Sequence, residues 1–417
     1  MTVLIAGGGI GGLTTALMLH QRGIDCEVFE RSTEIKELGV GINTLPHAIK
    51  ELAELGLLEA LDAVGIRTLE LIYQNRLGQV IWQEPRGLHA GLDFPQFSIH
   101  RGKLQRVLHE AVLGRLGNAA VHTGCEVVGF EQNKDQAILQ IKERGSDRHR
   151  EVSGSAIIAC DGIHSVIRQS FHPGEGPPTW NGIMLWRGAT EWEPFLTGES
   201  MVISGGMDAK LVLYPISREV TDSSKVLMNW AVGAKIGDAK AQPPRREDWN
   251  REGQMSELLP FVEDKFSLDV LDPLALIRGT EVFYEYPMCD RDPLTRWSRG
   301  RVTLLGDAAH PMYPVGSNGA SQAILDARSL SDCLATNTNI VEALKAYEVE
   351  RLPVTSEIVH TNRSGGPERV IDVVNQRAPD GFDDLHDVAS AEELEAIVKG
   401  YSQLAGFNED KVNAEKQ

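Results

Sequence analysis

The sequence predicts an α/β protein in which a Rossmann-type nucleotide-binding domain carries an inserted, mainly antiparallel β-sheet domain. A glycine-rich turn directly follows a short apolar segment near the N-terminus, which is typical of the first βαβ unit of such a domain. Residues 201–203, 210–214 and 226–232 have the alternating pattern of antiparallel strands. The apolar segment 302–305 then predicts a return of the chain to the first domain, which is therefore discontinuous.

The domain division that we predict follows these changes of pattern. The clearest boundary is the stretch rich in Pro and Gly at residues 173–178. The nucleotide-binding domain comprises residues 1–72, 98–177 and 285–350, the sheet domain comprises residues 73–97 and 178–284, and a C-terminal helical segment comprises residues 351–417.

The glycines of the first βαβ unit each have a mechanical role. Apolar residues 3–6 predict a buried strand, and residues 10–22 predict the helix that follows it. Gly7 allows the tight turn between them, Gly9 lets a phosphate group approach the backbone, and Gly12 lets the helix pack closely on the strand. The unpaired N–H groups and the positive dipole end of this helix favour bound phosphate.

An acidic residue ends the second strand of this unit, which we predict at residues 26–29. Glu30 lies 18 residues after Gly12, where a carboxylate can accept hydrogen bonds from the ribose hydroxyls of an adenosine. Because no basic residue takes its place, a 2′-phosphate is disfavoured at this site. The sequence therefore predicts a nucleotide that lacks this phosphate.

The region between the first unit and the sheet domain alternates between helices and strands. Apolar residues at helical spacing predict helices over residues 45–61 and 103–113. Strands are predicted at residues 125–130, 137–141 and 155–160. This pattern indicates a nucleotide-binding fold that contains a small β-meander.

Composition and charge exclude several classes of function. The 417 residues are 42% hydrophobic, which is enough for the cores of two domains, and their formal net charge is −18. Such a charge provides no general attraction for nucleic acid or for an anionic membrane. No apolar run is long enough to cross a bilayer, so we expect a cytoplasmic enzyme. The five cysteines form no CxxC pair, which predicts reduced thiols and no metal site.

Two further motifs follow the glycine-rich turn in a fixed order. Residues 159–168 contain an Asp-Gly pair, and residues 306–311 begin with a Gly-Asp pair. With the first motif, they resemble the three signature motifs of the single-component FAD-dependent aromatic monooxygenases, the p-hydroxybenzoate hydroxylase-like group. The resemblance covers roughly residues 1–350 and is specific because all three motifs occur in order. It implies a glutathione-reductase-like FAD-binding fold with an inserted substrate domain.

The resemblance implies that FAD lies extended, with its adenosine near Glu30 and its ribityl chain near Asp307. A carboxylate can accept hydrogen bonds from the ribityl hydroxyls. The helix expected at residues 321–334 would point its positive end at the flavin pyrimidine ring, where reduced flavin carries negative charge. The implied FAD contacts are Gly7, Gly9, Ile10, Gly11, Gly12, Glu30, Arg31, Gly41, Ile42, Arg101, Gln105, Val127, Asp161, Gly162, Asp307, Pro314, Gly316, Gly319 and Ala320.

Two places depart from the family pattern. The usual Gly-Ala before the Asp-Gly pair is Ala-Cys at residues 159–160, and the usual Gly-Gln-Gly before the last helix is Ser-Asn-Gly at residues 317–319. Both replacements are small, so we expect changes in packing without loss of binding. Asp161 and Arg168 also have structural alternatives, a helix N-cap for the first and a surface ion pair for the second.

The chemistry that the resemblance implies is carried by the cofactor. NADH or NADPH reduces FAD, reduced flavin captures O2 as a C4a-hydroperoxide, and this species hydroxylates an aromatic carbon. The protein has to hold that carbon beside the flavin and exclude water. Because the sequence has no second glycine motif, NAD(P)H is expected to bind without its own Rossmann domain. No side chain is assigned as a general acid or base, and His310 is interpreted as a scaffold residue.

A closer resemblance concerns the substrate. Residues 82–87, 95–101 and 310–322 look like the branch of the family that contains the phenazine-carboxylate monooxygenase of pyocyanin biosynthesis. This implies a fused or N-heteroaromatic substrate, with a carboxylic acid as one option, and Arg187 is suited to pair with a carboxylate. Aromatic residues at alternating strand positions are also common in cores, so that alternative stays open. The candidate substrate contacts are Trp186, Arg187, Tyr214, Trp230 and Tyr313.

Other functions remain as alternatives. A flavin-dependent reductase or dehydrogenase of the same fold would use FAD without inserting oxygen. A binding module, as in the prenylated-GTPase chaperones that reuse this fold, would not need Asp307 or the small residues at 316–320. A plain NAD dehydrogenase would leave the second and third motifs unexplained. We therefore expect an enzyme whose partners are an aromatic small molecule and O2, and which is a monomer or a homodimer.

Overall fold

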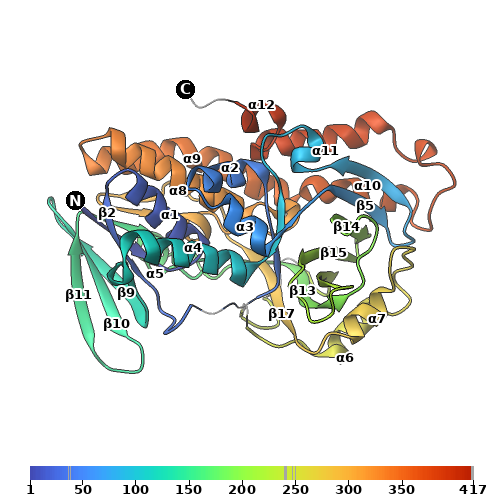
Figure 1. The fold of residues 1–417 in the computed structure, drawn as a ribbon, viewed down its shortest axis with the longest axis horizontal. Coiled ribbons are helices and arrows are strands. Elements are labelled where there is room, and N and C mark those ends of the chain that lie inside the picture. The colour runs from blue at the N-terminus through green and yellow to red at the C-terminus, as the bar shows by residue number, and fades with distance from the viewer. Residues whose placement is uncertain (36, 38, 239–241, 247, 249, 415–417) are drawn as a thin grey trace.

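The computed structural model describes residues 1–35, 37, 39–238, 242–246, 248 and 250–414, and two large sheets organise them (Figure 1). The first sheet has six strands in the order β18, β19, β12, β1, β2, β8, which pair in parallel except for β18. Its strands are β1 Thr2–Ala6, β2 Asp25–Phe29, β8 Val121–His122, β12 Ala156–Ala159, β18 Ser298–Arg299 and β19 Val302–Leu304. Distant parts of the chain therefore meet in one sheet.

The first sheet lies between two layers. Ile5 of β1 lies beside Gly12 of α1, whereas its neighbour Leu4 lies beside Gly154 of β11. Because successive side chains of a strand point to opposite faces, the helix and the small β9–β11 sheet cover different faces. Helix α1 packs against α4 and α8 in the helical layer. The elements of the two layers are α1 Ile10–Gln21, α4 Arg101–Leu116, α8 Gly319–Thr336, β9 Cys125–Gln132, β10 Ala137–Glu143 and β11 His149–Gly154.

The second sheet has seven strands in the order β17, β13, β16, β15, β14, β5, β6. Only β14 and β5 pair in parallel, so the sheet is mainly antiparallel, and the predicted fold class is confirmed. Its strands are β5 Glu70–Asn75, β6 Val80–Pro85, β13 Thr179–Trp192, β14 Ser200–Gly205, β15 Ala209–Ser217, β16 Val226–Lys235 and β17 Phe283–Asp290.

Short elements connect the two sheets. The single helix predicted at residues 45–61 is wrong, because Gly56 adopts φ +69° and separates two helices there. Glycine is the residue that tolerates this left-handed conformation. The connecting elements are α2 Pro46–Glu54, α3 Leu58–Val64, β3 Gly41–Thr44, β4 Ile66–Arg67, β7 Phe97–His100 and α5 Val166–Phe171. Two further helices, α6 Met255–Leu258 and α7 Pro273–Arg278, lie between β16 and β17 of the second sheet.

The C-terminal part of the chain is helical, as its pattern predicts, and it packs on both sheets. Helix α9 runs through the predicted boundary at residue 350 without a break. Val370 and Val374 of α10 belong to the same buried cluster as Leu71 and Met201 of the second sheet. These helices are α9 Ile340–Arg363, α10 Arg369–Arg377, α11 Ala391–Ala405 and α12 Glu409–Val412.

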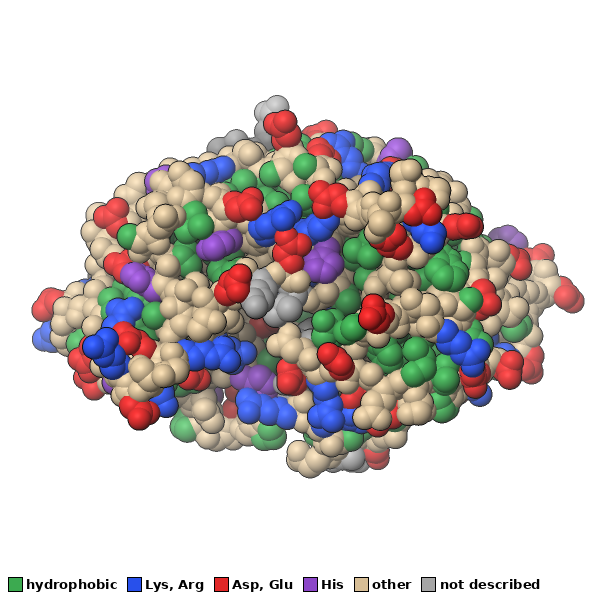
Figure 2. Space-filling model, turned by 60° about the horizontal axis from the view of Figure 1, so that its bottom comes forward, with side chains coloured by type: hydrophobic (Ala, Val, Ile, Leu, Met, Phe, Trp, Pro, Cys, Tyr) green, Lys and Arg blue, Asp and Glu red, His purple; other side chains and the backbone are tan. Residues whose placement is uncertain are grey.

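The surface agrees with the acidic composition. On the face shown in Figure 2, acidic and basic side chains are interspersed, and no broad basic area stands out among the residues that are coloured. The face shown, on a protein with a net charge of −18, offers no general attraction for a polyanion.

Candidate active site

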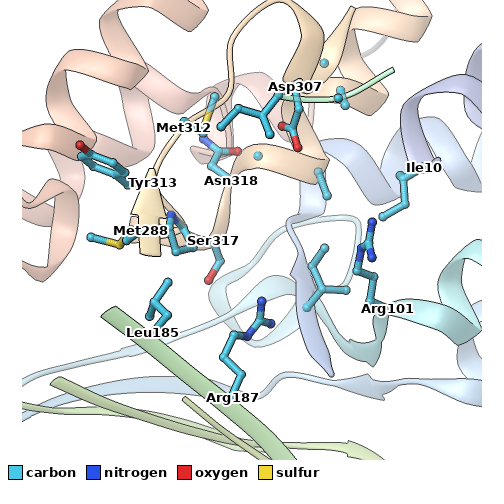
Figure 3. A pocket seen from close by; sticks show the side chains of 18 of the residues that line it. Ile10, Arg101, Leu185, Arg187, Met288, Asp307, Met312, Tyr313, Ser317 and Asn318 are labelled. Carbon is cyan, nitrogen blue, oxygen red and sulfur yellow. The ribbon is translucent and has the colours of Figure 1, made fainter. Parts of the chain in front are cut away.

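One cavity of about 950 Å³ is lined by residues of both sheets. Glu30, which follows β2, and Asp307, which follows β19, both line it, so the residues predicted for the two ends of FAD share one space. Figure 3 shows Asp307, Arg101, Arg187 and Tyr313 around the cavity, with Arg187 and Leu185 on the side of the second sheet. A cavity of this volume, lined by residues of both sheets, can hold a cofactor and a second ligand.

Most of the predicted FAD residues line this cavity. The exceptions are Gly12 and Gly316, whose positions have packing roles described below. Those that line it are Gly7, Gly9, Ile10, Gly11, Glu30, Arg31, Gly41, Ile42, Arg101, Gln105, Val127, Asp161, Gly162, Asp307, Pro314, Gly319 and Ala320.

The glycine-rich turn has the geometry of an anion site at a helix N-terminus. Gly9 is the N-cap of α1, and a Cβ built there meets no atom within 4 Å, so the cavity begins directly at its backbone. A Cβ at Gly12 would collide with the Gly7 carbonyl oxygen. Gly7 itself has φ +107° and lies against Cys160. Gly9 is therefore free for a phosphate, whereas Gly7 and Gly12 serve the packing of the turn.

The Glu30 carboxylate is held by the backbone of two neighbouring turns. The Gly8 N–H donates to Oε2 at 2.7 Å, and the Ser32 N–H donates to Oε1 at 2.8 Å. Each carboxylate oxygen has a second lone pair, and Glu30 lines the cavity. The Gln105 side chain in turn donates to the Gly8 carbonyl at 2.8 Å. These contacts fix Glu30 in an orientation in which it can accept hydrogen bonds from a ribose.

Asp307 offers an acceptor inside the cavity. Its side chain is exposed to the cavity, but the surrounding protein raises its pKa through burial, while the charges of His310 and Arg101 oppose this shift. Burial also lowers the pKa of Arg101, and Asp307 opposes that shift. The charge of each group thus opposes the effect of burial on the pKa of the other, and both side chains face the cavity (Figure 3).

Asp326 of α8 holds the turn that carries Asp307. The Gly306 N–H donates to Asp326 Oδ2 at 3.1 Å, His310 Nε2 lies 2.5 Å from the same oxygen, and Arg351 Nε donates to Oδ1 at 2.8 Å. Burial alone would raise the pKa of Asp326, but the charges and hydrogen bonds of His310 and Arg351 lower it overall. His310 is therefore part of the scaffold, in agreement with the interpretation from the sequence.

The Asp161 turn contains an unpaired buried oxygen. The helix N-cap is Ser165, whose hydroxyl accepts from the Arg168 N–H at 2.9 Å, so Asp161 is not the cap. Asp161 Oδ2 accepts from the Val166 N–H at 3.0 Å, while its buried Oδ1 has no hydrogen-bond partner among the described residues. An orphaned acceptor that faces a cavity fits a ligand with hydroxyl groups.

Arg168 has a structural role, but not at the surface. Its side chain is only 1% exposed and forms an ion pair with Glu175. It also donates to the carbonyls of Ala308 at 3.2 Å and Ala309 at 2.7 Å. The surface ion pair considered for it is therefore wrong, and the buried guanidinium instead ties the second motif to the Asp307 turn.

The loop before α8 brings small residues to the cavity. Pro314, Gly319 and Ala320 line it, and α8 begins at Gly319. Gly316 has φ +68°, and a Cβ there would lie 2.5 Å from the Tyr401 hydroxyl. The glycine at 316 thus allows close packing against the C-terminal segment, which the sequence motif alone did not indicate.

The part of the cavity beside the second sheet is apolar, and we call it the inner chamber. Its apolar walls include Leu185, Met201, Ile203, Val212, Met288 and Met312. None of these six is among the candidate substrate contacts predicted above, because single Met, Leu, Ile or Val residues carry no sequence signal beyond core packing. Methionine adapts its shape and makes favourable contacts with aromatic rings, so these walls suit a planar apolar ligand.

Arg187 is a cationic group of the inner chamber. Its Nη1 donates to the Tyr286 hydroxyl at 2.8 Å, its Nη2 donates to the Gly41 carbonyl, and it also hydrogen-bonds to Tyr214. The Gly41 N–H donates to Asn229 Oδ1 at 2.7 Å, so the second sheet holds both sides of this peptide. Burial, against the effect of Arg187, raises the pKa of Tyr214 to about 12, and its hydroxyl stays protonated at neutral pH.

Two of the five predicted substrate residues do not line the cavity. Trp186 and Trp230 lie in a buried cluster on the other face of the second sheet, where their indole N–H groups donate to Glu285 and Thr280. Successive side chains of β13 point to opposite faces of the sheet, so Trp186 faces this cluster and its neighbour Arg187 faces the chamber. Both tryptophans are therefore core residues, as the alternative stated for aromatic residues in strands predicts. Arg187, Tyr214 and Tyr313 line the cavity.

Comparison with known proteins supplies the family. A family profile described as an FAD binding domain matches residues 1–187 and 288–362. The chain is 46% identical over 366 residues to a phenazine 1,6-dicarboxylic acid hydroxylase, PhzS, from Lysobacter antibioticus, covering 87% of this chain and 89% of that protein. The chain belongs to the FAD-dependent aromatic monooxygenases. It is also 31% identical over 365 residues to a 3-hydroxybenzoate 6-hydroxylase from Aquipseudomonas alcaligenes, covering 85% and 86% of the two chains.

A solved structure agrees with this fold. An HpxO variant from Klebsiella pneumoniae complexed with FAD superposes with a TM-score of 0.75 over 98% of this chain and 99% of that chain, at 23% identity. The monooxygenase uses FAD, with NADH or NADPH as co-substrate, and these comparisons favour hydroxylation over the reductase alternative.

FAD fits the residues of this monooxygenase. The open space at Gly9, the unpaired Asp161 oxygen and the Asp307 carboxylate lie along one cavity, as a diphosphate joined to a polyol requires. Glu30, Asp161, Asp307 and the N-terminus of α8 would hold it. When bound, FAD supplies the redox chemistry, accepting a hydride from NAD(P)H and activating O2 for hydroxylation.

One departure from the family pattern carries a measurable cost. Ser317 adopts φ +53°, a left-handed conformation that side chains rarely adopt, at a position where the family usually has glycine. We expect Ser317→Gly to raise the free energy of unfolding by about 0.5–1 kcal/mol, since the relieved strain exceeds the added chain entropy. Urea unfolding of the apoprotein would measure this change. An unchanged or lower stability would show that the Ser317 backbone is not strained.

No helix in the described part of the chain is both long and apolar enough to cross a membrane. Within the same residues, no group of three or more His, Cys, Asp or Glu side chains is arranged to hold a metal ion.

Proposed function

We propose that this monooxygenase hydroxylates a planar N-heteroaromatic carboxylate of the phenazine type. Arg187 carries the proposal, because it is a guanidinium in an apolar chamber that forms no ion pair with a carboxylate among the described residues. A buried cation without a counter-ion is costly, and a carboxylate on the ligand would remove that cost. The 46% identity to a protein named for a phenazine dicarboxylic acid supports the same substrate class.

The walls of the chamber support the aromatic part of the proposal. Met201 and Met288 are less than a tenth exposed and line the cavity on the side of the second sheet, and Met312 approaches it from the flavin side. Fused rings would bury their faces against these thioethers and leave little room for water. Exclusion of water matters because it favours transfer of oxygen to the ring over loss of the activated oxygen as hydrogen peroxide.

The protein's own contribution to the reaction is to hold the substrate in position relative to the flavin. Arg187 bridges the substrate side and the flavin side, since it contacts Tyr286 in the second sheet and the Gly41 carbonyl in β3. A carboxylate held by this guanidinium would be fixed relative to Gly41 and Ile42, which are among the implied FAD contacts. We assign no general base, and Tyr214 remains a neutral hydrogen-bonding group.

A substrate screen tests the proposal. NAD(P)H oxidation would be measured with phenazine-1-carboxylate, phenazine-1,6-dicarboxylate, unsubstituted phenazine and simple phenols, and products would be checked by mass for one added oxygen. We expect the phenazine carboxylates to be the best substrates. Faster, coupled hydroxylation of uncharged phenols would contradict the proposal.

Replacement of Arg187 tests the role of its charge. We expect Arg187→Met to raise KM for phenazine-1-carboxylate by roughly 10- to 100-fold, because a charge-assisted hydrogen-bonded pair is lost. Unsubstituted phenazine provides the control substrate, and its KM should change by less than about threefold, since methionine preserves the apolar volume. An equal rise in KM for both compounds would indicate that Arg187 acts only on the flavin side and does not bind the substrate carboxylate.

We also propose that the enzyme acts in the cytoplasm as a monomer or homodimer. None of the five cysteines, all of which lie in the described part of the chain, forms a disulfide, which suits a reducing compartment. Light scattering after gel filtration would give the oligomeric state. The domain division and the FAD contacts given above likewise stand as proposals.

A further inference from the structure

The second sheet ends at β17, and a short stretch of chain before α6 runs along the outer edge of this strand. We call residues 245, 246, 248 and 250–253 the edge segment. The Gly253 N–H donates to the Phe283 carbonyl at 2.8 Å, and the Glu285 N–H donates to the Arg251 carbonyl at 2.9 Å. These bonds satisfy backbone groups of β17 that an edge strand otherwise leaves unpaired.

The edge segment also reaches the cavity of the active site. Asp248 and Asn250 line this cavity together with Leu185 and Arg187 of β13, and both are exposed as well, so they lie at its rim. The Asn250 N–H donates to Asp248 Oδ1 at 3.0 Å, and the Arg251 N–H donates to the Asp248 carbonyl at 3.2 Å. These bonds tie the two rim residues to the backbone of Arg251.

Glu285 is the buried charge that anchors the edge segment. Its side chain is only 1% exposed. Arg245 Nη1 donates to Oε1, Arg251 Nε donates to the same oxygen at 3.1 Å, and Trp186 Nε1 donates to Oε2 at 3.2 Å. Arg245 has a second partner in Glu257, at 2.8 Å, but that carboxylate is 39% exposed. The buried carboxylate therefore holds two arginines of the segment against the second sheet.

The same strand contacts the substrate side on its other face. Tyr286 follows Glu285 in β17, and its hydroxyl accepts the 2.8 Å hydrogen bond from Arg187 Nη1. Because successive side chains of a strand point to opposite faces, β17 contacts the arginines of the edge segment on one face and Arg187 on the other. Glu285 itself is not among the described residues that line the cavity, so its effect on the reaction is indirect.

We propose that Glu285 is a positioning residue that fixes the edge segment at the rim of the substrate cavity. Through Arg245 and Arg251 it keeps Asp248 and Asn250 in place, and a fixed rim limits the entry of water beside the substrate. The inference rests on the proposed function, because that function places the substrate against Arg187. Loss of the anchor would loosen the rim and increase the loss of activated oxygen as hydrogen peroxide.

Two variants compare the buried and the exposed partner of Arg245. Glu285→Gln removes the buried charge and keeps an oxygen acceptor of the same shape, whereas Glu257→Gln removes the exposed partner and is the matched control. The FAD-loaded proteins would be treated with trypsin, which cleaves after arginine. Mass spectrometry would follow cleavage after Arg245, Arg246 and Arg251. This readout needs neither a substrate nor turnover.

We expect cleavage at these arginines to be about tenfold faster in Glu285→Gln than in the wild type. Cleavage follows local opening of the segment, and hydrogen bonds to a charged group are lost. Glu257→Gln should stay within about twofold of the wild type, because an exposed ion pair contributes little. With phenazine-1-carboxylate, Glu285→Gln should also form several-fold more hydrogen peroxide per NAD(P)H, and Glu257→Gln should not.

Three results would overturn the positioning role. The first is equal cleavage of Glu285→Gln and Glu257→Gln, and the second is faster cleavage of Glu285→Gln throughout the chain. The third is faster cleavage of the edge segment without more hydrogen peroxide. If the wild type does not hydroxylate phenazine carboxylates, the proposed function fails, and peroxide measured with the best substrate of the screen still decides this inference.

A further variant covers the case in which Glu285→Gln does not fold. Arg251 is 47% exposed, so Arg251→Gln removes one of the two anchoring contacts with little effect on the core. Cleavage after Arg246 at least about threefold faster than in the wild type would support the anchoring role. Cleavage at the wild-type rate would overturn it.

Discussion

Replacing Gly9 with alanine is expected to weaken FAD binding by about 10- to 100-fold without unfolding the apoprotein. The added methyl group meets no protein atom within 4 Å, so the empty turn can accept it. It would occupy space that the phosphates need when they approach the N-terminus of α1. Fluorescence titration with FAD and thermal unfolding of the apoprotein would measure the two parts of this expectation.

Gly12→Ala is the matched comparison, with the opposite outcome. The same methyl group there would collide with the Gly7 carbonyl oxygen, which belongs to the backbone and cannot rotate away. We expect a loss of about 3 kcal/mol in the free energy of unfolding, a typical cost of overpacking between a helix and its strand. If both alanine variants merely lost stability, or both merely lost FAD affinity, the assigned difference between the two glycines would be wrong.

Asp307→Ala should give the second large effect, a protein purified with little bound FAD. Removal of the carboxylate leaves ribityl hydroxyls without this acceptor, and we expect the FAD dissociation constant to rise by roughly 10- to 100-fold. The turn itself should persist, because Asp326 holds Gly306 and His310 independently of the Asp307 side chain. Isothermal titration of the apoprotein with FAD would provide the measurement.

Asp307→Asn supplies the control for that experiment. An amide keeps one oxygen acceptor and the shape of the side chain, so a smaller loss than for alanine is expected. If neither substitution changes the FAD dissociation constant, Asp307 does not contact the cofactor. If both unfold the protein, as judged by circular dichroism, its role is structural.

The βαβ unit could be predicted because its determinants are local. Gly7, Gly9 and Gly12 each match a short-range requirement, and the acidic residue at 30 follows at a fixed spacing. The structure adds the reasons that depend on distant atoms. Cys160 blocks any side chain at Gly7, for example, and no pattern within the first thirty residues indicates that contact.

The substrate side could be predicted only in part, because alternation does not reveal which face of a strand meets the core. Trp186 and Arg187 are neighbours on β13, and both seemed suited to an aromatic acid. The structure turns Trp186 toward Phe261, with ring centroids 5.6 Å apart, and Arg187 toward the cavity. Leu258 of α6 and Leu276 and Ile277 of α7 complete the buried cluster around Trp186, and their presence cannot be read from β13 itself.

The C-terminal contribution was outside the reach of the sequence. Tyr401 follows the last recognisable motif and belongs to an amphipathic helical stretch whose pattern indicates packing but no partner. Its contact with Gly316 depends on how the whole C-terminal segment folds back onto the loop before α8. Gly316, which the resemblance assigned to cofactor contact, thus also has to be a glycine because Tyr401 of the C-terminal segment packs against it.

The parallel pairing of β12 with β19 has a consequence for the newly made chain. When β1, β2 and β12 have left the ribosome, the outer edge of β12 still lacks the partner at Val302–Leu304, because the whole second sheet is synthesised first. An apolar strand with free N–H and C=O groups is prone to pair with other chains during that delay. Fragments that stop before residue 302 should therefore aggregate, and slow translation of the intervening segment should lower the yield of native enzyme.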